Sequence, residues 1–176
     1  MNFTLLTEAQ KQEYSDQILA LLTHCDRDFV PPLSTRFSTS DTKFSTETVA
    51  NNGVLAYFKD MIRESMLAAT EGNRLLGFVT FKRNLTCKYM TPDTFPNLYI
   101  CTLLLSPAAR GMGLTAKMYA HLFDTLYPTH NLYTRTWSTN AAHIKILDRF
   151  GFAEIARIEN DRGAGIDTVY FGKKRA

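Results

Sequence analysis

One apolar run, Leu98–Leu105, constrains the fold of this chain more than any other segment. It is nearly continuous, yet far shorter than the roughly 18 apolar residues that a membrane span needs. Such a run is typical of a central β-strand that is covered on both faces. A strand of this kind needs partner strands and covering elements, so the run predicts a mixed α/β protein.

The residues after this run form a candidate anion-binding loop. The segment Arg110–Thr115 places glycines at positions 111 and 113 directly before a predicted helix. The first N–H groups of a helix have no internal partners and carry partial positive charge, and an arginine adds a bidentate donor. The segment predicts either a pyrophosphate cradle or a strand-to-helix turn whose glycines relieve crowding.

The loop matches neither of two well-known phosphate-binding motifs. The P-loop pattern GxxxxGK[ST] is absent, and so is the dinucleotide pattern GxGxxG. The loop also lies late in the chain, without the acidic residue that would follow on a second strand. If the segment is a phosphate cradle, it is therefore of neither of these two kinds.

Apolar periodicity predicts the other elements of a single domain over residues 1–176. The predicted strands are Phe3–Leu6, Met66–Thr70, Leu75–Lys82, Leu98–Leu105, Leu132–Trp137, Ala153–Glu159 and Ile166–Gly172. The predicted helices are approximately Glu8–Thr23, Val54–Glu64, Gly111–Tyr127 and Asn140–Phe150. Two irregular segments, Asp28–Ser45 and Asn84–Asn97, interrupt this order.

Composition and charge argue against several classes of function. A net charge of +3 over 176 residues is too weak to indicate nucleic-acid binding. No membrane span and no secretory signal are visible in the sequence. The three cysteines show no metal-ligand spacing with the histidines, and their odd number suits a reducing compartment. We therefore expect a cytoplasmic protein that binds no metal.

The apolar run and the loop together resemble the cofactor-binding motif of the GNAT superfamily of N-acetyltransferases. That motif is an apolar strand followed by [QR]-x-x-G-x-[GA] at the opening of a helix. Arg110, Gly113 and Thr115 occupy the three patterned positions. Thr115 departs from the usual Gly or Ala, but its backbone N–H still donates and its hydroxyl can add a hydrogen bond to phosphate.

A second resemblance lies at the distance that the superfamily predicts. The segment from Asn140 to Phe152 is similar to its N-x-x-[AS]-x-x-x-Y-x-x-x-G-F helix, with Gly151 also in register. His143 replaces a small residue, and Leu147 stands where many members carry tyrosine. Asn140, His143 and Leu147 share one helical face, because spacings of three and four make neighbours on a helix.

The resemblance implies the fold, the reaction and the cofactor contacts. The fold would be α/β (α+β mixed), with a mostly antiparallel sheet of about six or seven strands, about four flanking helices, and a splay between two central parallel strands. The reaction would transfer an acetyl group from acetyl-CoA to a primary amine of a small molecule by direct attack in a ternary complex. The expected cofactor-binding residues are Leu103, Leu104, Leu105, Arg110, Gly111, Met112, Gly113, Leu114, Thr115 and Asn140.

The catalytic groups are less evident. The attack needs a group that accepts the proton of the amine and a proton source for the departing thiolate. Many members place a Glu on the central strand, but residues 99–102 contain no carboxylate. Tyr99, Cys101 or a water chain would substitute, although each side chain also has a structural explanation, and a lone buried cysteine is usually an inert small hydrophobe. His143 is the best candidate for the general acid, with a phosphate contact or a buried polar cap as the alternatives.

The acceptor site is expected in the two irregular segments, since loops on a rigid scaffold often carry specificity. Arg36 and Asp93 are their notable charges, and each also fits a solvated position. The aromatic residues that would wall an acceptor pocket or anchor the loops are Phe29, Phe37, Phe44, Tyr89 and Phe95. The alternative functions are a protein or peptide N-acetyltransferase and a non-catalytic acyl-CoA-binding module. A homodimer is compatible with each of them.

Overall fold

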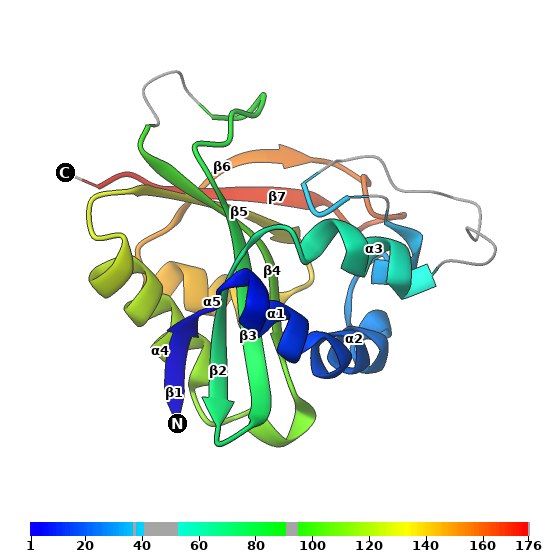
Figure 1. The fold of residues 1–176 in the computed structure, drawn as a ribbon. Helices are drawn as coiled ribbons and strands as arrows, with labels where there is room; N and C mark the ends of the chain where they lie inside the picture. The colour runs from blue at the N-terminus through cyan, green and yellow to red at the C-terminus, as the bar shows by residue number, and fades with distance from the viewer. Residues whose placement is uncertain (37, 41–52, 91–94, 176) are drawn as a thin grey trace.

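Seven strands form one sheet in the computed structural model, which describes residues 1–36, 38–40, 53–90 and 95–175. The order across the sheet is β1-β2-β3-β4-β5-β7-β6, and β4 and β5 run parallel while all other neighbours are antiparallel (Figure 1). The strands are β1 (Asn2–Leu5), β2 (Ser65–Glu71), β3 (Arg74–Arg83), β4 (Asn97–Leu105), β5 (Asn131–Trp137), β6 (Ala153–Ile158) and β7 (Thr168–Lys173). The expected fold class is confirmed.

Five α-helices and several shorter helical turns connect the strands within these described residues. The α-helices are α1 (Glu8–Glu13), α2 (Ser15–His24), α3 (Gly53–Met61), α4 (Leu114–Ala120) and α5 (Ala141–Arg149). The turns are η1 (Asp26–Asp28), η2 (Leu33–Thr35), η4 (Pro107–Ala109) and η5 (His121–Leu126), the last a π-helical continuation of α4. None of these helices is long and apolar enough to cross a membrane.

Two predicted helices have different bounds in the structure, whereas the other elements agree to within a few residues. The helix expected over Glu8–Thr23 is divided at Tyr14, whose backbone (φ −88°, ψ 2°) ends α1. The helix expected from Gly111 begins at Leu114 instead. Gly111 and Gly113 have φ angles of 78° and 67°, which a right-handed helix does not allow.

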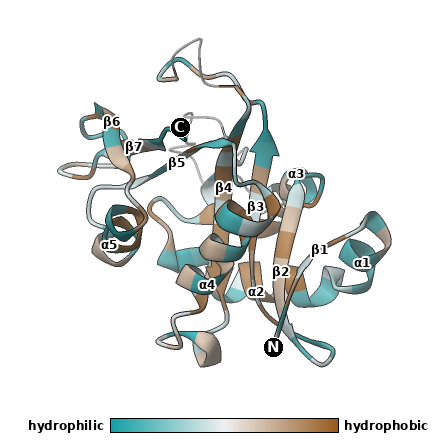
Figure 2. Ribbon diagram, turned by 90° about the vertical axis from the view of Figure 1, so that its left-hand side faces the viewer, coloured by the Kyte–Doolittle hydropathy of each residue, from teal (hydrophilic) through white to brown (hydrophobic). Residues whose placement is uncertain are grey.

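Both faces of the sheet are covered, as the apolar character of β4 predicted. Side chains of β2 alternate between two cores: Leu67 and Ala69 belong to the core with α4 and α5, and Met66 and Ala68 to the core with α2 and α3. All four side chains are fully buried. In Figure 1, α2 and α3 lie toward one side of the strands and α4 and α5 toward the other. Figure 2 shows hydrophobic residues along the central strands, while α1 is largely hydrophilic.

The centre of the sheet opens where β4 leaves β5. The parallel ladder joins four residue pairs, from Asn97 with Asn131 to Ile100 with Thr134. Immediately beyond it the register between β3 and β4 shifts, and Cys101 is the extra residue of a β-bulge. A bulge bends its strand and increases the local twist, so the two strands diverge past this point. The splay expected between the central parallel strands is confirmed.

The bulge also changes which residues of β4 face α4. Before the bulge, the side chains of Leu98 and Ile100 belong to the core with α4. After it, Leu103 and Leu105 pack against that core, and Leu104 belongs to the opposite one. Even-numbered side chains thus give way to odd-numbered ones, which turns Leu103 into the space between the diverging strands.

Candidate active site

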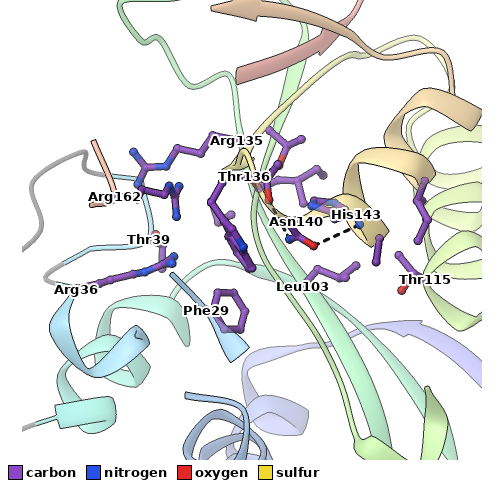
Figure 3. A pocket seen from close by; sticks show the side chains of 16 residues that line it. Phe29, Arg36, Thr39, Leu103, Thr115, Arg135, Thr136, Asn140, His143 and Arg162 are labelled. Atoms are coloured by element: carbon purple, nitrogen blue, oxygen red, sulfur yellow. Dashed lines mark hydrogen bonds between the residues drawn. The ribbon is translucent and has the colours of Figure 1, made fainter. Parts of the chain in front are cut away.

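The space between β4 and β5 forms a cleft made of two adjoining cavities. The inner cavity extends toward Arg36, Arg135 and Arg162 (Figure 3). The outer cavity extends toward Asp28 and Arg110. Both cavities share a set of lining residues from β4, α4, β5, α5 and the segments that precede α5 or follow α2: Phe29, Leu103, Thr115, Trp137, Asn140 and Ala142. The cleft therefore runs from the glycine loop, Arg110–Thr115, to a group of three arginines.

The glycine loop has an open surface. Arg110 and Thr115, which begin and end the loop, line the outer cavity. A Cβ atom added at Gly111 or Gly113 would meet no atom within 4 Å, so the glycines do not relieve crowding. They are required by their positive φ angles instead. Lys117 is the first residue of α4 whose N–H bonds to the preceding backbone, at 3.2 Å from the Gly113 carbonyl, and the amides before it are those a helix leaves without an internal partner.

The guanidinium of Arg110 has partners within the protein. Its Nη2 donates to Oδ2 of Asp28 at 2.5 Å and lies 3.4 Å from Sγ of Cys25. The hydrogen bond to Asp28 raises the pKa of Arg110. Both side chains of the ion pair are about half exposed, at 49% each. The positive charge expected at the loop is therefore partly compensated by a carboxylate that sequence reasoning did not connect with it.

Asn140 caps α5 at the wall of the cleft. Its Oδ1 accepts a hydrogen bond from the backbone N–H of His143 at 3.3 Å, and its Nδ2 donates to the Thr136 hydroxyl at 3.0 Å. An N-cap of this kind satisfies a helix donor that has no internal partner. The asparagine of the second motif thus fixes the start of α5 against β5 and faces both cavities.

His143 lines the inner cavity and makes a hydrogen bond to α4. Its Nε2 lies 2.8 Å from the hydroxyl of Tyr119, which is fully buried. Burial lowers the pKa of His143 to about 4 and raises the pKa of Tyr119, so both groups are neutral at pH 7. With the Tyr119 hydroxyl as donor, the imidazole proton is carried by Nδ1. Leu147, at the position where tyrosine is common, is fully buried in the core.

The structure separates the other two candidate catalytic residues. Cys101 lines the inner cavity. Burial and the nearby Glu64 carboxylate raise the pKa of its thiol well above the usual value, so the group stays protonated at neutral pH. Tyr99 packs in a small cluster with Met90 and Tyr133, and it is not among the described residues that line the cleft. A catalytic role for Tyr99 has no geometric support.

A buried carboxylate, that of Glu64, lies behind the wall of the inner cavity, and no sequence motif predicted it there. Glu64 is only 6% exposed, and its Oε1 accepts a hydrogen bond from the hydroxyl of Thr39 and lies 3.4 Å from Nζ of Lys82. Its Oε2 has no hydrogen-bond partner among the described residues. Thr39 and Cys101 both line the cavity, so they separate this carboxylate from the cleft. Glu64 ends the predicted second helix, and nothing in the local sequence distinguishes it from a surface residue.

Three arginines from separate segments line the inner cavity. Arg36 follows η2, Arg135 lies in β5, and Arg162 lies between β6 and β7. Figure 3 shows their guanidinium groups together at one side of the cavity, opposite His143 and Thr115. Sequence reasoning singled out only Arg36, because Arg135 and Arg162 belong to no motif.

The remaining loop residues have varied positions. Phe29 lines both cavities, whereas Tyr89 packs against Tyr170 with ring centroids 4.5 Å apart and the rings tilted by 40°, and Phe95 is 52% exposed. Phe37, Phe44 and Asp93 lie outside the described residues. Within the described ranges, no group of three or more His, Cys, Asp or Glu residues could hold a metal ion.

The family of the chain follows from its sequence between η2 and the end of α5. Residues 33–152, about two thirds of the chain, match the model of the Acetyltransferase (GNAT) family. The chain belongs to this family. The match covers the glycine loop, the bulged strand and the capped helix, so the resemblance inferred from the two motifs is confirmed. No curated protein matches the chain.

Solved structures agree with this assignment at the level of the fold. A ribosomal-protein-alanine N-acetyltransferase from Brucella melitensis has a TM-score of 0.67 and 15% identity over 99% of this chain and 100% of its own. A putative acetyltransferase from Salmonella typhimurium, solved with acetyl-CoA, has a TM-score of 0.63 and 18% identity over 99% and 93%. A putative phosphinothricin N-acetyltransferase has a TM-score of 0.64 and 13% identity over 99% and 98%. By their names, GNAT proteins of this shape include enzymes for proteins and for small molecules.

Proposed function

We propose that this GNAT protein transfers the acetyl group of acetyl-CoA to a primary amine of a small molecule in a ternary complex. The observation that carries the proposal is the continuous cleft that leads from the glycine loop to the inner cavity. When bound, acetyl-CoA supplies the thioester carbon that the amine attacks. The chain's own residues would hold the two substrates, accept the proton of the amine and stabilise the departing thiolate.

The residues at the outer end of the cleft fit the diphosphate and the pantetheine arm of the cofactor. The loop Gly111–Gly113 has open space above its backbone, and the helix start behind it supplies unpaired N–H groups. Beyond the bulge β4 no longer pairs with β5, so the backbone groups of Leu103–Leu105 on that edge form no hydrogen bonds to β5. Backbone groups on that edge are available to an extended, amide-containing arm, as in the addition of a strand to a sheet.

We assign acceptance of the amine proton to Glu64. The carboxylate is buried behind Thr39 and Cys101, and its Oε2 has no hydrogen-bond partner among the described residues. A proton can pass from an amine in the inner cavity to Glu64 through the Thr39 hydroxyl or through a bridging water. The protonated Cys101 thiol fits a place in the wall and not the role of an acyl-carrying nucleophile.

We assign stabilisation of the departing thiolate to His143, acting as a neutral imidazole that donates a hydrogen bond. Its Nε2 faces the hydroxyl of Tyr119, which leaves Nδ1–H to hydrogen-bond the departing sulfur. His143 would keep this proton, because its loss would have to be made good by a tyrosinate at Tyr119, whose pKa burial raises. The proton that finally neutralises the thiolate would be the one that the amine has released. The hydrogen bond from Nδ1–H takes over the role that tyrosine fills at position 147 in many relatives.

The small-molecule function is favoured over modification of a protein chain because of how the inner cavity is built. Side chains from the segment after α2, from β5 and from the β6–β7 connection surround it. A pocket walled by separate segments suits a compact acceptor, whereas an extended peptide needs an open groove. The neutral His143 and the buried Glu64 favour an enzyme over a module that only binds acyl-CoA.

Two measurements test the proposal in order. Acetyl-CoA should raise the melting temperature of the protein, whereas ATP and NAD should leave it unchanged, because only a ligand of the native state stabilises it. Thiol release with a panel of small amines should then exceed release without an amine. Absence of any shift with acetyl-CoA or CoA would rule out both the enzyme and the binding module. A shift without turnover on any amine or peptide would favour the module.

A further inference from the structure

Glu64 lies between the cleft and a second cavity. On the side of the cleft, Thr39 and Cys101 form the wall in front of its carboxylate. The second cavity, which we call the rear cavity, is lined by Glu64 itself, by the start of β2, by the end of β3 and by His130. Among the described residues, none lines both the rear cavity and the cleft.

We infer that the rear cavity is the exit through which Glu64 passes the proton of the acceptor amine to water while both substrates occupy the cleft. The inference rests on the proposed function and adds to it a separate route for the proton. Three features support it: the proton balance of the reaction, the strand register around Glu64, and two buried polar atoms that lack partners.

The proton balance of the reaction requires an exit to water. A primary amine is an ammonium ion at neutral pH, because its pKa is about 10. It loses one proton before it attacks the thioester, and a second one as the C–N bond forms and the C–S bond breaks. The second proton neutralises the thiolate. Each turnover therefore leaves one proton over, which water takes up.

The cleft is a poor exit for this proton. In the proposed ternary complex the cofactor fills the outer cavity, and the amine fills the inner one beside the wall of Thr39 and Cys101. A proton that returned through that wall would meet the amine from which it came. Glu64 must nevertheless be a free carboxylate again before it accepts the second proton. A route that leads away from the cleft meets both requirements.

The register of the sheet places Glu64 between the two cavities. Ser65 pairs with Phe81, so Glu64 comes beside Lys82 at the end of β3. Its Oε1 lies 3.4 Å from Nζ of Lys82. The next strand is β4, whose bulged residue Cys101 belongs to the wall of the cleft. The carboxylate thus reaches this wall from β2, while Glu64 and its neighbours in the chain line the rear cavity.

The two carboxylate oxygens of Glu64 have different surroundings. Oε1 accepts a hydrogen bond from the Thr39 hydroxyl and lies near Lys82, whereas Oε2 has no hydrogen-bond partner among the described residues. A buried oxygen of this kind is costly unless water reaches it. Asp60, the other carboxylate of the rear cavity, accepts a hydrogen bond at Oδ2 from the backbone N–H of Thr39 at 3.2 Å. Oε2 of Glu64 is therefore the oxygen that needs a water in the rear cavity.

His130 provides a second atom of this kind. Its Nδ1 is buried and has no hydrogen-bond partner in the described part of the chain, and the residue lines the rear cavity. Burial and the charge of Arg83 lower the pKa of His130, so its imidazole is uncharged at neutral pH. A buried water needs about two to four polar partners. Glu64 and His130 supply two of them, which fits a path of water from the carboxylate to the surface.

Replacement of the carboxylate by a small acid tests the route. Glu64→Ala should lower kcat, and formate should restore it by about tenfold or more, because formate supplies a carboxylate in the space that the side chain leaves. Arg63, Lys82 and Arg83 line the rear cavity and favour the entry of an anion. The restored rate should persist at saturating acetyl-CoA and amine, since formate that enters from the rear competes with neither.

A block of the rear cavity gives a second measurement. Ser65 is the smallest of its described lining residues, so Ser65→Trp fills space beside Glu64. In the otherwise wild-type protein it should lower kcat and raise the solvent deuterium isotope effect on kcat, because release of the proton becomes slower. Combined with Glu64→Ala, it should abolish the effect of formate. The rise in melting temperature with CoA should stay unchanged, which reports that the cleft is intact.

Asn73→Trp is the matched control. Asn73 lies in the exposed turn between β2 and β3, at the end of β2 that is far from Glu64. A tryptophan there shows whether an added large side chain changes the kinetics by itself. It should leave kcat, the isotope effect and the response to formate unchanged.

The outcomes separate this inference from the proposed function. Formate that fails to restore activity, or that loses its effect as the amine is raised to saturation, overturns the rear exit. An undiminished effect of formate in the double variant with Ser65→Trp overturns the assignment to this cavity. A near wild-type kcat in Glu64→Ala removes Glu64, and the exit with it, and leaves the acetyltransferase intact. Absence of thiol release with any amine, together with no change of melting temperature with CoA, overturns the proposed function itself.

Discussion

Arg110, in the loop after β4, and Asp28, in η1, form an ion pair with 2.5 Å between Nη2 and Oδ2. The two residues are 82 positions apart in the chain, and both line the outer cavity. The pair connects the glycine loop to the segment that contains Phe29, which lines the cleft. It also places a negative charge beside the site proposed for a diphosphate, so it should oppose the binding of coenzyme A to a measurable degree.

Removal of that negative charge is the first test. Asp28→Asn should lower the dissociation constant of CoA by about two- to fivefold, as expected for an exposed charge pair, and Arg110→Ala should raise it by a similar factor. Isothermal titration calorimetry at two salt concentrations measures both effects, which should shrink at high salt. Arg74→Ala, which breaks the exposed pair with Glu71, is the control. Weaker CoA binding by Asp28→Asn would show instead that the pair serves to hold the segment in place.

The positive φ of Gly113 gives a second prediction. Gly113→Val should destabilise the protein by about 1–2 kcal/mol, because a side chain at this φ of 67° is strained, and it should weaken CoA binding by disturbing the start of α4. Gly72 is a matched control, with a φ of 58° in the β2–β3 hairpin and open space around it. Urea unfolding should show similar losses for Gly72→Val and Gly113→Val. Equal CoA affinity for the two variants would contradict the assignment of the loop.

The buried imidazole of His143 makes the stability depend on pH. Its folded-state pKa of about 4 lies below the ordinary value of 6.5, so the unfolded chain binds more protons between these values. Stability therefore falls as the pH is lowered from 6.5, and the loss levels off below pH 4 at up to about 3 kcal/mol. His143→Gln should lose less stability than the wild type over this window in urea unfolding. Identical pH profiles for the two proteins would show that folding does not change the pKa of His143.

The proposed proton acceptor gives a kinetic prediction. Glu64→Gln keeps the shape of the side chain and should lower kcat by about 100-fold or more, because acid–base groups typically contribute factors of this size. The loss should fall mainly on kcat and leave CoA binding unchanged. Asp60→Asn is the control, since Asp60 also accepts a hydrogen bond from Thr39, from its backbone N–H, but has no part in the proposed proton transfer. A Glu64→Gln enzyme with near wild-type kcat would remove Glu64 from the mechanism.

The local part of the site could be predicted from the sequence. The strand, the glycine loop and the capped helix are each encoded by neighbouring residues, as in the bond from Asn140 to His143 three positions later. Local capping and backbone conformation leave a pattern that can be read along the chain. The same holds for the parallel centre of the sheet, which followed from the resemblance that these local motifs carried.

The long-range part could not be predicted. Arg162 donates to a carbonyl 132 residues away, and Glu64 lies behind the wall of the cleft because β2, which follows it directly, pairs with β3. Neither residue lies in a recurring pattern. Tyr99 shows a related difficulty: in a continuously apolar strand the sequence has no alternation, so the shift of phase at the bulge is invisible.

The short ladder between β4 and β5 has a mechanical consequence. Only four residue pairs join the half of the sheet that contains β1–β4 to the half that contains β5–β7, whereas β3 and β4 are joined by seven and β5 and β7 by six. If the halves are pulled apart across the sheet, this seam is the line along which hydrogen bonds yield first. A molecule that lies between the diverging strands and contacts both of them would link the two halves of the sheet. Binding of such a molecule should therefore also raise the force that is needed to separate the halves.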